Sequence, residues 1–258
     1  MTSKRVLFKL PQQKWQAGRV VLNWSGDPIG DLERVARSYA SLAHDRVKAL
    51  QSQGRPLTGG DEFQAYPIVF LYRQAFELTL KAIVFAGAVF LRDIGEEPLG
   101  LGQVMRHDLM PLFKEVDRIF NAIVPGGSPW DFDLPELRTR SDFQQIVREF
   151  DYYDRGSYTF RYPVKKDGET ASLDLGFEFD LFAFATLMGR ILPALGGAPE
   201  WIREVMQGRW EAAYEAQQEA WANADYEPPD YDYDPSDYEP PDYDYDPSDY
   251  DPPDYDPE

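Results

Sequence analysis

The sequence contains no cysteine at any of its 258 positions. A disulfide framework, a zinc site built on thiolates and a cysteine nucleophile are therefore all excluded. A chain of this length buries enough apolar surface to fold without a covalent cross-link. Because a cysteine-free protein fits the reducing cytoplasm well, we expect a cytoplasmic location.

Histidine is nearly as scarce, since only His44 and His107 occur. Two histidines cannot build a histidine-rich metal site within one chain. The sequence also lacks the glycine-rich loop that cradles phosphate, the GxSxG turn of serine hydrolases and the HExxH zinc motif. We therefore expect neither a metal nor another cofactor. Any general acid or base of the imidazole type must be one of these two residues.

Long apolar runs are missing as well. The longest, Ala82 to Leu91, has ten residues and includes a glycine, whereas a helix that crosses a bilayer needs about 20 apolar residues. The N-terminal segment is basic but has no apolar stretch of the kind found in a secretory signal. We therefore expect neither a membrane span nor a secretory signal.

The last 34 residues contain no lysine or arginine and repeat the unit DYEPPDYDYDPS. They hold 15 acidic side chains, so the other 224 residues carry 26 basic and 30 acidic side chains, a net charge of only −4. Nine prolines and the like charges oppose helix and sheet, which predicts a disordered tail at 225–258 beside a folded body at 1–224. Its tyrosines and carboxylates can imitate bases and phosphates and so occupy a basic groove of the body or of a partner. A harmless repeat that arose by slippage is the alternative.

Hydrophobic periodicity predicts a mainly α-helical body of about six helices. The second of them is apolar almost all round, which predicts a central helix packed on several sides. Between the fourth and fifth, residues 157–177 alternate and contain a turn, which predicts one small β-hairpin. The expected helices cover 27–51, opened by Asp27 and Pro28; 61–92; 109–123, capped by Asp108; 141–153, opened by a capping box at Ser141; 180–195; and 199–224.

Charged side chains mark one candidate site on the second helix. Arg73, Glu77 and Lys81 follow each other at i, i+4 and i+8, so they share one face. If that face is buried, the charges need partners or a function; if it is exposed, they are an ordinary helix ion pair. His107, at the start of the next helix, is a candidate general base or phosphate contact, and a helix-capping role is the alternative.

Three blocks of the chain resemble a group of bacterial HEPN-like proteins. In order, they are YPIVFLYRQAFELTLKAIV, RHDLMPLFKEVD and SYTFRYPVKKDG, and together they span residues 66–168. The resemblance implies an antiparallel helical bundle that dimerises. It also implies, in many members, a metal-independent ribonuclease of a toxin–antitoxin, CRISPR or phage-defence system. Histidine then deprotonates the ribose 2′-OH, and arginine stabilises the charge that develops on the phosphate.

The match to the group's catalytic signature, an arginine followed after about four to six residues by a histidine on one helix, is incomplete. Gln74 stands where the group has a histidine, and glutamine cannot take up and return a proton near neutral pH. A composite site of Arg73, Glu77, Lys81 and His107 is geometrically possible instead, if the start of the third helix folds over the second helix. Arg37 and His44 have the nuclease spacing but lie on the first helix, outside the matched blocks, where an exposed helix face is the simpler interpretation.

The sequence therefore leaves two functions open. The first is a HEPN-type RNA-binding protein or metal-independent endoribonuclease that is screened by its own acidic tail. It would act as a homodimer, with RNA and an antitoxin or nucleotidyltransferase as partners. The second is a non-catalytic helical interaction protein whose tail docks on a basic partner. Gln74 favours the second, and so does the small net charge of the body, because RNA binders usually have a basic excess. The order of the three matched blocks favours the first, which we take as the leading hypothesis.

Overall fold

The computed structural model describes most of the body and part of the C-terminal region. The chain divides into two units, Met1–Ala212 and Ala213–Glu258. The described part of the second unit, 213–223, is exposed helix. The tail predicted at 225–258 lies outside the described residues, which are 25–127, 137–165, 167–174 and 176–223 with the positions 20, 22, 130, 132, 134 and 135.

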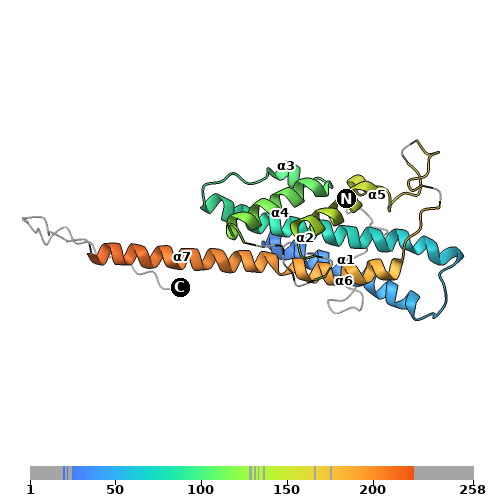
Figure 1. Ribbon diagram of the computed structural model, residues 1–258, viewed down its shortest axis with the longest axis horizontal. Helices are drawn as coiled ribbons and strands as arrows, with labels where there is room; N and C mark the ends of the chain where they lie inside the picture. The colour runs from blue at the N-terminus through green and yellow to red at the C-terminus, as the bar shows by residue number, and fades with distance from the viewer. Residues whose placement is uncertain are drawn as a thin grey trace, which may run out of the picture. The chain divides into compact units, whose positions relative to one another are not determined.

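The described residues are mainly α-helical, which confirms the predicted class (Figure 1). The long helices agree with the predicted ranges to within a few residues, and a short helix occupies part of a stretch expected to be a loop. In chain order the elements are α1 (Pro28–Gln51), the 3-10 helix η1 (Gly59–Gln64), α2 (Ala65–Asp93), α3 (Leu101–Val104), α4 (Leu109–Ile123), α5 (Arg140–Tyr153), the 3-10 helix η2 (Arg155–Ser157), α6 (Leu181–Gly196) and α7 (Ala198–Asn223).

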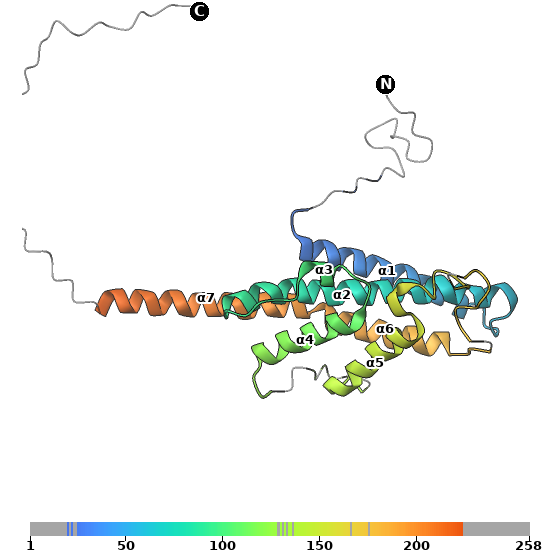
Figure 2. The ribbon, with the colours of Figure 1, turned by 90° about the horizontal axis from the view of Figure 1, so that it is seen from above.

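Helix α2 is the central helix of the first unit, as its apolar sequence predicted. Seventeen of its 29 residues are buried, and α1, α4 and α6 all pack against it. Figure 2 shows α1 and α2 side by side and running in opposite directions, with α4 on the other side of α2. Charged residues near the middle of α2 are therefore enclosed from several directions.

Two of the predicted helix starts are confirmed in detail. The Asp27 carboxylate accepts the N–H of Gly30, and Pro28 takes the first helical position of α1, where a missing N–H costs nothing. Asp180 accepts two N–H groups of the first turn of α6. These bonds satisfy donors that a helix start otherwise leaves open.

Two other caps differ from the prediction. The capping box of α5 is formed by Thr139 and Asp142, not by Ser141, because the chain is still extended at Thr139 and already helical two residues later. Asp108 occupies the cap position of α4, but its side chain accepts no hydrogen bond there. The first N–H of α4 donates instead to Asp151 of α5, over 3.4 Å. A long-range contact thus replaces a local cap.

The β-hairpin expected near 157–177 is not confirmed, because the described residues contain no strand. The chain does reverse there, and Val164 and Ala171 form an isolated antiparallel bridge. Pro163 lies at the edge of this bridge and has no N–H with which to continue a ladder. Alternation predicted the reversal correctly but overstated the pairing.

Aromatic side chains fill the core between α2, α4 and α5. Phe143 of α5 lies at the centre of this cluster: its ring centroid is 4.6 Å from that of Trp130, 5.6 Å from Phe113 of α4 and 5.8 Å from Phe76 of α2. All four residues are buried. The cluster fixes α4 and α5 on the same side of α2.

Two helical stretches are long and apolar enough, by length and composition alone, to cross a membrane: Gly59–Asp93 and Leu181–Asn223. Most of the apolar window of the first is buried inside the structure, against 39% for the second. The first contains the central helix α2, and a buried core helix passes the same test. The absence of a membrane span remains a prediction.

Gly87 of α2 is a position where a single methyl group should be costly. A Cβ built there would lie 2.3 Å from Cδ1 of buried Ile119 in α4, and two more atoms of that side chain are nearly as close. We expect Gly87→Ala to lower the free energy of unfolding by about 1–3 kcal/mol in urea denaturation, through overpacking. Gly208→Ala is the matched control: it meets no atom within 4 Å in α7 and should stabilise by up to about 1 kcal/mol. Equal effects of the two substitutions would contradict the close approach of α2 and α4.

Candidate functional site

The charged stripe of α2 is buried. Arg73 has none of its surface exposed, Glu77 has 1% and Lys81 has 5%. The Glu77 carboxylate lies between the two cations: Oε2 accepts a hydrogen bond from Arg73 Nη1, and Oε1 accepts one from Lys81 Nζ over 2.6 Å. Buried ions of this kind need partners. The three residues provide them for one another.

His107 lies against this stripe, as the composite site requires. Its Nδ1 atom is 3.0 Å from Glu77 Oε1, although it is 30 positions away in sequence. The second terminal nitrogen of Arg73 donates to the backbone carbonyl of His107. The structure therefore brings together Arg73, Glu77, Lys81 and His107. Of the four, His107 is the one that is largely open to solvent, with 51% of its side chain exposed.

The protonation of Glu77 decides which nitrogen of His107 is free. Burial raises the pKa of the Glu77 carboxyl, but the charge of Arg73 and the hydrogen bond from Lys81 outweigh burial and hold the pKa below its usual value. Glu77 is then ionised at neutral pH and can only accept hydrogen bonds. His107 must therefore carry its hydrogen on Nδ1. In the neutral imidazole this leaves Nε2 as an acceptor.

A fourth charge, which the sequence analysis missed, completes the buried cluster. Asp154, directly after α5, is fully buried, and its Oδ2 atom lies 3.6 Å from Arg73 Nε. This distance allows an ion pair but is too long for a hydrogen bond. The other oxygen, Oδ1, accepts the N–H of Thr159 over 2.6 Å. Burial raises the pKa of Asp154, and the charge of Arg73 opposes this only in part.

Gln74, which stands where the HEPN-like group has a histidine, has a structural contact. Its amide Nε2 donates to the hydroxyl of buried Ser157 over 2.6 Å. Ser157 has a φ of +58°, a left-handed conformation that non-glycine residues rarely adopt. Gln74 thus holds a strained turn. The signals in the sequence were weak: an aspartate immediately after a predicted helix, and Gly156 two residues later.

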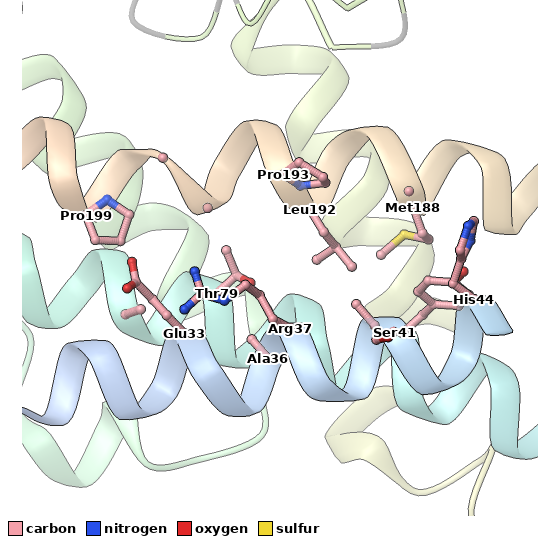
Figure 3. A pocket seen from close by; sticks show the side chains of 16 residues that line it. Glu33, Ala36, Arg37, Ser41, His44, Thr79, Met188, Leu192, Pro193 and Pro199 are labelled. Carbon is pink, nitrogen blue, oxygen red and sulfur yellow. The ribbon is translucent and has the colours of Figure 1, made fainter. Parts of the chain in front are cut away.

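The second candidate pair, Arg37 and His44, lies elsewhere. Both side chains are exposed on α1, have no ion-pair or hydrogen-bond partner among the described residues, and line a cavity of about 510 Å³ between α1, α2, α6 and the start of α7. In Figure 3 they point away from each other, Arg37 toward the Glu33 end and His44 toward the Met188 end. Tyr72 also lines this cavity, and its buried hydroxyl has no hydrogen-bond partner. The pair shares a pocket, but its side chains do not converge on one point.

Within the described ranges, no three histidine or carboxylate side chains are grouped so that they could hold a metal ion. The candidate sites are thus a buried charge cluster that carries one solvent-facing imidazole, and an open pocket with an arginine and a histidine at its edge. The chain matches no protein-family model, no curated protein and no solved structure.

Proposed function

We propose that this chain is a HEPN-type RNA-binding protein that cleaves RNA without a metal ion, with His107 as its general base. The pairing of Glu77 with His107 carries the proposal. An ionised, buried carboxylate fixes the imidazole by Nδ1 and leaves Nε2 without a bond to Glu77, in a side chain that is 51% exposed. A base oriented by a third group is the arrangement that activates hydroxyl nucleophiles in unrelated enzymes.

The chemistry follows from that geometry. Nε2 of His107 removes the proton from a ribose 2′-OH, and the oxygen attacks the adjacent phosphorus. The bond to the 5′-oxygen breaks, and this oxygen takes up a proton, which leaves a 2′,3′-cyclic phosphate and a 5′-OH end. Arg106 directly precedes His107 and is exposed. Its guanidinium is the cation that stabilises the charge developing on the phosphate.

The buried residues act through His107 in this proposal. Arg73 donates a hydrogen bond to the backbone carbonyl of His107, and Lys81 donates one to the Glu77 carboxylate. Both are therefore positioning residues that do not touch RNA. A homodimer, an antitoxin or nucleotidyltransferase partner, a cytoplasmic location and a screening role for the acidic tail complete the proposal. They are supported by the sequence and by the family resemblance.

A second function, a non-catalytic helical interaction protein, is favoured by one observation. Arg73, Glu77 and Lys81 satisfy one another inside the core, and Gln74 takes the place of the group's histidine as an anchor for a turn. Such a network can serve stability alone. The tail would then bind a basic partner.

Cleavage of RNA by the full-length chain in EDTA tests the first function. Single-stranded RNA should yield fragments with 2′,3′-cyclic phosphate and 5′-OH ends, which can be identified by mass spectrometry. The matched control is the same sequence with 2′-fluoro riboses, which has no 2′-OH to attack and should stay intact. No cleavage at protein concentrations equal to that of the RNA would favour the interaction protein.

A further inference from the structure

A second cavity, of about 790 Å³, lies beside η2 and is separate from the Arg37–His44 pocket. Its walls come from the end of α5, from η2 and from the reversal that follows. Three cations line it against one acidic residue, Asp174. We propose that this cavity, which we call the η2 cavity, binds one nucleotide unit of single-stranded RNA.

Two of the three cations are available to a ligand. Arg155 and Lys165 are exposed, and within the described part of the chain neither side chain donates a hydrogen bond or forms an ion pair; the charge of Lys165 acts on the Asp167 carboxylate only at longer range. The third, Arg161, is already held by the carbonyl of Ser157. Unpaired cations facing a cavity suit a phosphate group, which arginine and lysine both bind.

Aromatic rings border the same cavity. Tyr152 has 77% of its surface exposed, and its ring is nearly perpendicular to that of Tyr153, with ring centroids 4.8 Å apart. Phe177 packs on Tyr153 from within the wall, with centroids 4.9 Å apart. An exposed ring braced in this way offers a face on which a base can stack. A free phosphate has no aromatic face and could not stack on this ring.

The wall that carries Arg155 is held rigidly. Gly156 and Ser157 both have positive φ, and the strain is maintained by the bonds from Gln74 to Ser157 and from Thr159 to Asp154. Strained backbone persists where its surroundings fix it, and it is common at binding sites. Because the cations are placed before the ligand arrives, less ordering entropy is lost on binding.

The identification of the ligand as RNA rests on the proposed function, but the inference concerns binding, which does not require cleavage. The test uses the full-length chain and a fluorescein-labelled 2′-fluoro octa-adenylate, which cannot be cleaved, with fluorescence anisotropy at several salt concentrations. Arg155→Ala and Lys165→Ala should each weaken binding about five- to tenfold at low salt and lower the salt slope by about one. Tyr152→Ala should weaken it about tenfold. The matched controls, expected to bind as the unaltered chain does, are Arg148→Ala, Lys48→Ala and Tyr214→Ala.

Three results would overturn the inference: no binding by the unaltered chain, equal losses in the control variants, or displacement of the oligonucleotide by tripolyphosphate with Tyr152→Ala binding normally. The last result would mean that the cavity holds a phosphate rather than a nucleotide. If RNA is cleaved while all three cavity variants bind normally, the inference fails and the proposed function stands. If binding depends on the cavity and no RNA is cleaved, the reverse holds.

Discussion

Glu77→Ala is expected to lower the free energy of unfolding by about 3–5 kcal/mol, measured by urea denaturation. The substitution removes the one carboxylate that bonds both Arg73 and Lys81 inside the core. Of the buried carboxylates, Arg73 would then keep only Asp154, and Lys81 would keep none. An uncompensated buried charge is among the most costly defects in a protein.

Two comparisons isolate this effect. Glu200→Ala breaks an exposed pair with Arg203 on α7, and exposed pairs contribute about 1 kcal/mol or less. A quadruple variant with leucine at 73 and 77, methionine at 81 and asparagine at 154 removes the four buried charges together and should recover most of the stability lost in Glu77→Ala. If Glu77→Ala were no less stable than Glu200→Ala, the result would contradict the pairing of Glu77 with Arg73 and Lys81 inside the core.

The effect of Glu77 should also depend on pH. Burial alone would raise the pKa of Glu77 in the folded chain, but Arg73 and Lys81 outweigh burial and lower it. The stability that its ionised form contributes is therefore fully present above the unfolded pKa of about 4.3 and is lost as pH falls through the folded value. The difference between the unaltered chain and Glu77→Ala should narrow below about pH 4. Burial raises the pKa of Asp154 and Asp151, so their ionised forms lower the stability as pH rises, opposite to Glu77. The difference in stability between the unaltered chain and Glu77→Ala is therefore the quantity that isolates Glu77.

His107→Ala is expected to reduce RNA cleavage by about 10²- to 10⁴-fold, the usual contribution of a general base. The imidazole is the only part of the charge cluster that reaches solvent with a free nitrogen. Initial rates on single-stranded RNA in EDTA measure the effect. The matched control is His44→Ala, which removes the other histidine, also exposed, and should cleave normally.

The reverse result has a clear meaning. Loss of cleavage in His44→Ala with normal cleavage in His107→Ala would assign catalysis to the pocket that His44 shares with Arg37. Urea denaturation of both variants separates loss of the base from loss of the fold. His107→Ala gives up one bond to Glu77, so a modest loss of stability is expected there. It is too small to unfold the chain under assay conditions.

The helices were largely predictable, because periodicity and capping are local properties. Asp27 and Pro28 start α1 as expected, and the apolar sequence of α2 predicted its central position. The start of α5 was placed two residues late because Thr139 and Asp142 form a less familiar capping pair than serine with glutamine. The predicted hairpin became a single bridge, since Pro163 limits the pairing.

The candidate site was predictable only in part. Helical spacing showed that Arg73, Glu77 and Lys81 share a face, and the block order suggested His107 as a fourth member. Spacing cannot show which distant segment folds onto that face. Asp154 and Ser157 were therefore missed, since they join the site through tertiary contacts after α5.

The contacts of the charge cluster also have a consequence for the order of folding. Arg73 bonds the carbonyl of a residue 34 positions away, and its neighbour Gln74 bonds a residue 83 positions away. The α1–α2 hairpin closes a short loop, so we expect it to form early, whereas the cluster must wait for long loops to close. A compact intermediate with α5 misplaced would keep Arg73 enclosed without Asp154 beside it. Such misassembled states are raised in energy, so the cluster favours the correct arrangement of the bundle over its competitors.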